Sequence, residues 1–307
     1  MKLVRGSFAP DPPDRARRLF GLPFSAGGEA YYAAVFGDGR TDHSFRLLDG
    51  ETVVASVACD DAGGFIGRFG SPLEPIILPG QPRAVADMLG ELRRIAGDRP
   101  IRIALRDGAD ADGQMSSALL KAGAVPIVQI RAEADLSLDD EALLAACRKG
   151  ARQGVRWGRE HLTLRFVDAA NPDAAAFDAF RLLHAEVAGR VTRPLESWTA
   201  TLDLIRQGRA DLVLCDLDGV LMGGTLVMDA GDTAHYATGV YRRDHFDKPL
   251  AHAPLVCAMS RARARGLCWF DLGDLTATAT DKDAAIAGFK GGFSATARVG
   301  VVWTLAP

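Results

Sequence analysis

Hydrophobic and polar residues alternate along four short stretches in the second half of the chain, and this alternation predicts β-strands. Between and after these stretches, apolar residues recur every three or four positions, which indicates helices that bury one face. The predicted strands cover 211–217, 221–229, 235–241 and 267–272, and the predicted helices cover 254–265 and 283–290. The order gives a mixed, largely antiparallel sheet covered by helices. The predicted fold class is therefore α/β, or α+β.

The first half of the chain repeats this order of elements at a constant offset. Each repeated pair of residues is 169 positions apart (218 minus 49): Asp49, Gly50, Asp60 and Gly70 match Asp218, Gly219, Asp229 and Gly239. The same offset places 83–96 on 252–265 and Lys121 on Lys290. Such self-similarity is the signature of a duplicated unit. Each half should therefore fold as strand, turn, strand, loop, helix, strand and helix.

A length of 307 residues fits about two domains. We predict an N-terminal lobe at 1–135, a connecting helix at 136–162 and a C-terminal lobe at 163–307. Ser137 marks the start of the connecting helix. A basic stripe follows it and faces either solvent or phosphate groups: Arg148, Arg152, Arg156 and Arg159. Glycines on the other side indicate close backbone packing or a frayed helix: Gly150, Gly154 and Gly158.

Composition and charge narrow the class of protein. Apolar residues make up 48% and charged residues 24%, as in globular domains, and a net charge of -3 gives no overall attraction for polyanions. The five widely spaced cysteines predict buried, reduced thiols, and the six histidines show no metal-ligand spacing. Neither a signal peptide nor a membrane-spanning run is predicted. We therefore expect a cytoplasmic protein with no metal and no stable membrane insertion.

One short segment suggests another chemistry. Residues 212–221 read LVLCDLDGVL, which is typical of the nucleophile motif of haloacid-dehalogenase phosphatases. Such a phosphatase needs a helix directly after the motif, whereas 223–239 alternates as a strand. The first copy has LLDGETVV at the matching place, and Asp-Gly is a favoured pair in hairpin turns. The phosphatase is therefore a minor alternative to a hairpin.

The second half of the chain resembles the GNAT acetyltransferase superfamily. The resemblance lies in the meander, the following loop and helix, and a strand that ends in WFDLG at 269–273. Within the superfamily, the duplication and two further segments are similar to the Fem family, the aminoacyl-tRNA-dependent peptidoglycan bridge transferases and their acyltransferase relatives. These segments are AHYATG at 234–239 and GFKGGF at 288–293. The resemblance implies two tandem GNAT-like lobes that flank a cleft.

The resemblance places the pair Phe289 and Lys290 at the reaction centre of the second lobe. When an amine attacks an ester or thioester carbonyl, charge builds on oxygen, and the Lys290 ammonium can stabilise it. Residues alone would favour another role for this lysine, that of complementing the dipole at a helix end. Tyr236 would shape the pocket or pack at the sheet edge. Asp271 would polarise the amine or accept its proton, unless it is an ordinary turn residue.

The resemblance also implies basic residues that hold the diphosphate of a nucleotide-sugar acceptor. Arg193 is the first choice, together with Arg242 or Arg243, because a guanidinium fork fits phosphate oxygens. The alternative is that these are solvated loop arginines. Tyr241 completes the predicted substrate-binding set.

We therefore predict an N-acyltransferase or aminoacyltransferase that joins an activated acyl or aminoacyl group to an amine of a cell-envelope precursor or related metabolite. No cofactor is tightly bound, and the co-substrate is acyl-CoA or aminoacyl-tRNA. The helical hairpin insert of some bridge transferases is missing, which weighs against tRNA. The loop 242–248 lacks the glycines that hold CoA pyrophosphate, which weighs against CoA. An acetyl-CoA-dependent GNAT N-acetyltransferase and a non-catalytic binding protein remain alternatives.

Overall fold

A computed structural model describes residues 1–6, 26–106, 110, 112–245, 247–276 and 280–307. The chain forms two compact units, one made of residues 1–129 and 299–307 and the other of residues 130–298. Within the part of the chain described, no helix is both long and apolar enough to cross a bilayer.

The first unit holds a four-stranded sheet, a strand pair and three α-helices among its described residues. Its sheet has the order β1-β2-β3-β4, with the bounds Lys2–Arg5, Phe45–Asp49, Thr52–Val57 and Ile76–Ile77. β5 (Ile101–Arg106) pairs antiparallel with the end of β12 (Thr296–Leu305). The α-helices are α1 (Ala26–Phe36), α2 (Pro82–Ala96) and α3 (Gln114–Lys121), and two short 3₁₀ turns lie at Gly37–Gly39 and Ala62–Gly64.

The core of the first unit is formed by α2 and the strands that it covers. Phe45 and Val57 from the sheet, Leu92 from α2 and Ile103 from β5 are each fully buried in one apolar cluster. Trp303 of β12 lies in the same cluster. The last strand of the chain therefore contributes to the core of the first unit.

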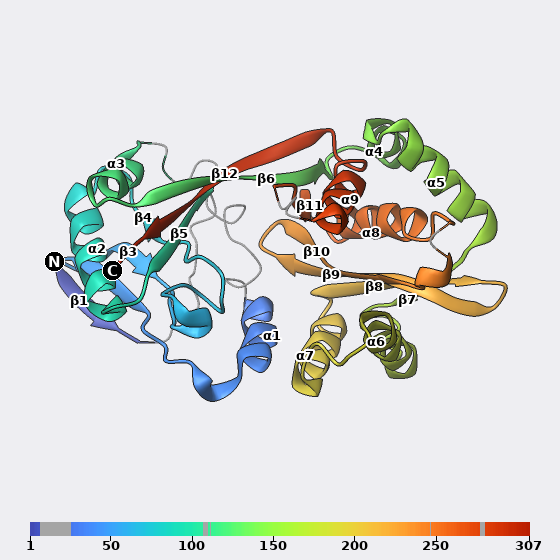
Figure 1. The fold of residues 1–307 in the computed structure, drawn as a ribbon, viewed down its shortest axis with the longest axis horizontal. Helices are drawn as coiled ribbons and strands as arrows, with labels where there is room; N and C mark the ends of the chain where they lie inside the picture. The colour runs from blue at the N-terminus through green and yellow to red at the C-terminus, as the bar shows by residue number, and fades with distance from the viewer. Residues whose placement is uncertain (7–25, 107–109, 111, 246, 277–279) are drawn as a thin grey trace. The chain divides into compact units, whose positions relative to one another are not determined.

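Among its described residues, the second unit holds the sheet strands β6 to β11, with helices on both faces of these strands (Figure 1). Its strands have the order β6-β11-β10-β9-β8-β7, and only β10 and β11 are parallel. The strand bounds are β6 (Val125–Asp135), β7 (Thr163–Val167), β8 (Ala210–Leu217), β9 (Val220–Ala230), β10 (Thr233–Tyr241) and β11 (Trp269–Asp274). The helices are α4 (Asp140–Ala146), α5 (Lys149–His161), α6 (Ala174–Ala188), α7 (Leu195–Arg206), α8 (His252–Ala264) and α9 (Asp281–Lys290). α5 and α8 lie on one side of the strands β7 to β10, and α6 and α7 lie on the other.

The duplication seen in the sequence is present as matching elements. The hairpins β2–β3 and β8–β9 turn at neighbouring positions of the matching Asp-Gly pairs: Gly50 begins the first turn and Gly219 ends the second, with φ of 60° and 78°. Glycine adopts such positive angles with little strain, so the repeated glycine marks a turn in each copy. α2, β5 and α3 then correspond to α8, β11 and α9. The predicted fold class is confirmed.

The strand after each last helix joins the other unit, and this moves the boundary between the units. β6 follows α3 of the first copy and pairs with β11, whereas β12 follows α9 of the second copy and pairs with β5. The predicted C-terminal lobe at 163–307 includes 299–307, which belong to the first compact unit in the structure.

The segment between the two copies is two helices, whereas one helix was predicted. α4 ends at Ala146 with Cys147 as its C-cap, and the Arg148 amide donates to the Gly292 carbonyl oxygen at 2.8 Å, outside the helical ladder. Asp139 caps α4 by accepting a hydrogen bond from the Ala142 amide, so the cap predicted at Ser137 is wrong.

The structure also corrects the expectation about the cysteines and tests the phosphatase alternative at residues 212–221. All five cysteines are free, but Cys268 is exposed and Cys257 is half-buried, so the prediction of burial holds only for the other three. The segment LVLCDLDGVL forms β8 and its turn, with Asp218 in the turn at φ of 53°. β9 begins at Val220, so the helix that a phosphatase would need is replaced by a strand.

Close packing of α5 on α8 explains two of the three glycines predicted to allow it. A β-carbon on Gly158 would lie 2.6 Å from Cβ of Ala253, and one on Gly154 would lie 2.6 Å from the His252 ring. A β-carbon on Gly150 would meet nothing within 4 Å. The missing side chains at Gly154 and Gly158 therefore let α5 contact the first turn of α8.

Alanine at two of these glycines, Gly158 and Gly150, should change the free energy of unfolding in different directions. We expect Gly158→Ala to lower the free energy of unfolding by about 1 to 3 kcal/mol, because the new methyl overpacks a rigid contact. Gly150→Ala should leave it unchanged or raise it by up to about 1 kcal/mol, because alanine favours the helix. Urea unfolding of both variants checks this, and equal effects would contradict the packing of α5 on α8.

Candidate active site where two parallel strands part

The parallel strands β10 and β11 pair only over their first three residues. The pairing runs from Thr233 with Trp269 to His235 with Asp271. Each strand then has an irregularity, between Tyr236 and Thr238 in β10 and between Asp271 and Gly273 in β11. We call the place where the strands part, just beyond His235 and Asp271, the fork. Ligands of α/β proteins commonly bind beyond the carboxyl ends of parallel strands.

Lys290, the last residue of α9, lies at the fork. Gly273 has a φ of 100°, and a β-carbon built there would lie 2.8 Å from the Lys290 Nζ. The ammonium therefore rests directly on the backbone of β11. Burial and the nearby Arg131 charge lower the pKa of Lys290, and they outweigh the attraction of Asp271 and Asp274. The matching residue of the first copy, Lys121, is exposed at the end of α3.

The Asp271 carboxylate is buried at the fork and has several partners. Arg131 donates to Oδ2 from Nε at 3.0 Å and from Nη2 at 2.7 Å. The Gly273 amide donates to Oδ1 at 2.8 Å, and His235 Nδ1 lies 3.2 Å from Oδ2. Burial alone would favour the neutral acid, but Arg131 and His235 hold the pKa of Asp271 far below its usual range. Asp271 is thus a permanently charged group and a poor proton acceptor.

The predicted aromatic residues lie in different places. Phe289 stands edge-on to Phe293 and to the His252 ring, with ring centres 4.9 and 5.3 Å apart. Tyr236 is half-buried, and its hydroxyl lies against Gly239, where a β-carbon would be 1.8 Å away. Burial raises the pKa of Tyr236, so the phenol stays protonated.

Tyr241, predicted to bind substrate, lies in an apolar cluster with Leu162 and Leu250. It is buried, and its hydroxyl hydrogen-bonds to the Thr225 hydroxyl at 2.6 Å. Its phenol is therefore committed to the core of the second unit.

The three predicted arginines occupy two sites. Arg193 donates from Nη1 to the Thr238 hydroxyl at 2.9 Å, and its guanidinium lies 5.5 Å from the Trp198 ring centre. Arg242 pairs with Glu186 at 2.7 Å and donates to the Leu221 carbonyl oxygen. Arg243 is exposed in a 3₁₀ turn at Arg243–His245. Arg193 thus reaches β10 beside its irregularity, whereas Arg242 and Arg243 follow the end of β10.

Two residues of the fork, Arg131 and His235, were missed from sequence. Comparison of the two copies offers a signal for the histidine. At the offset of 169 positions, Ile66 and Arg102 of the first copy stand where the second copy has His235 and Asp271. The second copy therefore has a histidine where the first has an apolar residue, and an acid where the first has a base. Arg131 precedes the second copy, so this comparison does not reach it.

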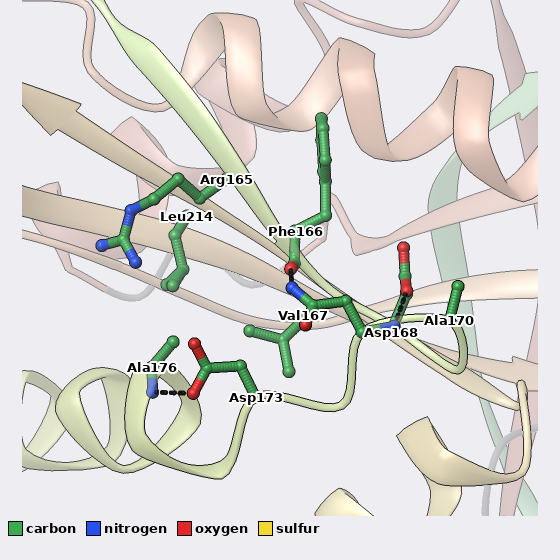
Figure 2. A pocket seen from close by; sticks show the side chains of 9 residues that line it. Arg165, Phe166, Val167, Asp168, Ala170, Asp173, Ala176 and Leu214 are labelled. Atoms are coloured by element: carbon green, nitrogen blue, oxygen red, sulfur yellow. Dashed lines mark hydrogen bonds between the residues drawn. The ribbon is translucent and has the colours of Figure 1, made fainter.

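A hollow of about 340 Å³ lies elsewhere in the second unit, between β7 and the start of α6. Its polar side chains already have partners: Asp173 accepts from the Ala176 amide (Figure 2) and also from the Ala175 amide, and Arg165 pairs with Asp216 at 2.6 Å. None of the predicted site residues lines it. The fork is therefore the better candidate site. In the described residues, no three His, Cys, Asp or Glu side chains gather to hold a metal ion.

Comparison with known proteins agrees with the fold. Residues 145–283 match the family model of the GNAT acetyltransferase domain, and no curated protein matches the sequence. The crystal structure of FemX is 13% identical, with a TM-score of 0.66, over 100% of this chain and 98% of that one. A tandem GNAT protein from the clavulanic acid biosynthesis pathway is 16% identical, with a TM-score of 0.57, over 99% and 98%.

A third solved structure widens the comparison. The C-terminal domain of a putative lysylphosphatidylglycerol synthetase from Agrobacterium fabrum is 14% identical, with a TM-score of 0.58, over 95% of this chain and 89% of that one. Residues 145–283 therefore match a GNAT acetyltransferase domain, and the fold of the whole chain is similar to that of FemX and of the tandem GNAT protein, as its sequence predicted.

Proposed function

We propose that the protein is an N-acyltransferase that joins an activated acyl or aminoacyl group to an amine of a cell-envelope precursor or related metabolite. The GNAT domain supports acyl transfer in general. The observation that carries the proposal is the Lys290 ammonium resting on Gly273 at the fork. When the amine attacks the carbonyl carbon, the oxygen becomes negative, and one fixed donor stabilises it by about 3 to 4 kcal/mol.

The N-terminal end of α8 helps to decide between acyl-CoA and aminoacyl-tRNA as the acyl donor. Acyl-CoA enzymes of this fold use free amides at this helix N-terminus to hold pyrophosphate. Here the His252 amide is bonded to the Pro249 carbonyl oxygen, Pro254 has no N–H, and α5 covers this turn through Gly154 and Gly158. The GNAT domain by itself favours acyl-CoA. The covered helix start favours an aminoacyl ester such as aminoacyl-tRNA, and we propose that donor.

Acetyl-CoA should therefore leave the melting temperature of the protein unchanged. A ligand at a hundred times its dissociation constant stabilises a protein by about 2.7 kcal/mol, which corresponds to a shift of roughly 5 to 10 °C. A thermal-shift titration with acetyl-CoA, with inorganic pyrophosphate as the control for charge, measures this. A saturable rise with acetyl-CoA alone would identify the acetyl-CoA-dependent alternative as the function.

Product formation tests the transfer itself. Purified protein is incubated with labelled aminoacyl-tRNA and a mixture of amine acceptors, including nucleotide-linked amino sugars and peptides, and the label is followed into a new amide. We expect an amide product that depends on the protein. Binding of donor and acceptor without any product would instead support a non-catalytic binding protein.

The acceptor is proposed to carry phosphates that meet Arg243 and, after exchange of their present partners, Arg193 and Arg242. The exposed position of the Arg243 guanidinium supports this. We also propose a cytoplasmic location, since cytoplasmic proteins meet aminoacyl-tRNA and nucleotide-linked precursors.

A further inference from the structure

His235 is the last residue of β10 before the fork, and one of its ring nitrogens has no protein partner. The side chain is 10% exposed, and Nδ1 lies 3.2 Å from Asp271 Oδ2. Nε2 is buried and makes no hydrogen bond within the described structure. A buried polar atom without a partner ordinarily costs about 1 to 3 kcal/mol, so such atoms call for a functional reason.

The partners of Asp271 set which nitrogen of His235 carries the proton. Arg131 and the Gly273 amide hold the carboxylate in place and keep it ionised. An ionised carboxylate only accepts hydrogen bonds, so Nδ1 must donate its N–H to Asp271. The neutral ring then carries its lone pair on Nε2. A histidine oriented by a buried carboxylate is the arrangement that makes Nε2 a proton acceptor.

We infer that His235 is the proton acceptor for the attacking amine at the fork, with Asp271 and Arg131 as its positioning residues. This inference rests on the proposed acyl transfer. The amine nitrogen forms a bond to the carbonyl carbon, and one of its protons moves to His235 Nε2. The bond from that carbon to the ester oxygen then breaks, and the same proton passes from the imidazolium to the departing oxygen. The ring is neutral again after each turnover, so atoms and charges balance.

The charges around His235 come from four elements of the second unit. Asp271 on β11 bonds it directly, Asp229 on β9 interacts with it through charge, and Arg131 on β6 and Lys290 on α9 act on the same Asp271. Two carboxylates favour the imidazolium that forms during transfer. The Lys290 ammonium remains the partner of the carbonyl oxygen, so the two groups act on different atoms of the reaction.

Two substitutions separate the proton acceptor from a structural histidine. His235→Asn keeps an amide donor near the position of Nδ1 and removes Nε2, whereas His235→Gln puts a non-basic amide near Nε2. We expect both to lower kcat at least a hundredfold, with KM changed less than threefold, and to change the shape of the pH profile. His161→Asn is the control, because His161 is exposed, bonds the Trp157 carbonyl oxygen through Nδ1 and stacks on the Trp157 ring. If folded His235→Asn keeps turnover within threefold and an unchanged pH profile, the inference is overturned.

A second measurement needs no turnover. Nitrogen NMR of the ¹⁵N-histidine-labelled protein, assigned with the His235 variants, should show Nδ1 protonated and Nε2 unprotonated at the pH of the activity assay. An Nε2–H tautomer, or an imidazolium at every pH where the protein is folded, would overturn the role of His235 alone. A wild-type protein that is inactive with every donor would overturn the proposed function, and this role with it.

Discussion

Replacement of Lys290 by methionine is expected to lower kcat at least tenfold, toward the hundredfold to thousandfold loss that follows removal of one oxyanion donor. Methionine keeps the length and the apolar stem of lysine but removes the charge. KM for the donor should change little, because the oxygen becomes negative only in the transition state. The Lys290 ammonium already lies on the Gly273 backbone, so the substrate meets a charge that needs no rearrangement.

The duplication supplies a matched control for this substitution. Lys121 occupies the equivalent position in the first copy and is exposed. Lys121→Met should leave kcat and KM unchanged, and steady-state kinetics of both variants at one pH makes the comparison. Unchanged turnover in a folded Lys290→Met protein would remove Lys290 from the mechanism. Equal losses of kcat in both variants would show that removal of either lysine disturbs folding in general.

Replacement of Asp211 by alanine is expected to lower the free energy of unfolding by about 3 kcal/mol or more. Asp211 is buried near the start of β8, where it accepts from Arg261 and from Arg265, each at 2.7 Å. Arg265 also bonds Asp229 on β9 at 2.8 Å. This cluster ties the end of α8 to the sheet. Without Asp211, two partly buried guanidiniums would lose their common partner.

An exposed pair in the same unit is the control. Asp203 and Arg206 lie 2.8 Å apart on α7, and each is 50% exposed. Asp203→Ala should cost less than about 1 kcal/mol, because water screens the pair. Denaturant unfolding of both variants gives the two values. A small loss for Asp211→Ala would contradict the view that this cluster fastens α8 to the sheet.

The repeat allowed much of the fold to be predicted. The turn at Gly50 and Glu51 and the turn at Asp218 and Gly219 depend only on local backbone preferences, which a sequence shows directly. Helices with one apolar face, such as α2, are visible for the same reason. Such local signals fixed the order of the elements, and the order identified the fold.

The pairing of distant strands could not be read in the same way. Nothing near β12 in the sequence shows that Gly300–Leu305 pair with β5, because that choice is made by contacts some 200 residues apart. The break between α4 and α5 likewise depends on the Arg148 amide reaching Gly292. Partners far away in the sequence decided both features.

The site was predicted in part. Lys290 was found through a family resemblance and Asp271 through its place at the end of a predicted strand, and the structure brings both to the fork. His235 was set aside because a lone histidine has no spacing to signal a role. Its significance comes from Asp271 and Arg131, which lie 36 and 104 positions away (271 minus 235 and 235 minus 131). Only folding places these three side chains together.

The central claim is that acyl transfer takes place at the fork, and a crystal structure with a stable donor analogue tests it most directly. The analogue is an aminoacyl-adenosine whose reactive ester is replaced by an amide. We expect its carbonyl oxygen to lie within about 3 Å of the Lys290 Nζ, with the carbonyl carbon beside His235. An analogue bound away from the fork, or a Lys290 ammonium turned into bulk water in the complex, would contradict the account.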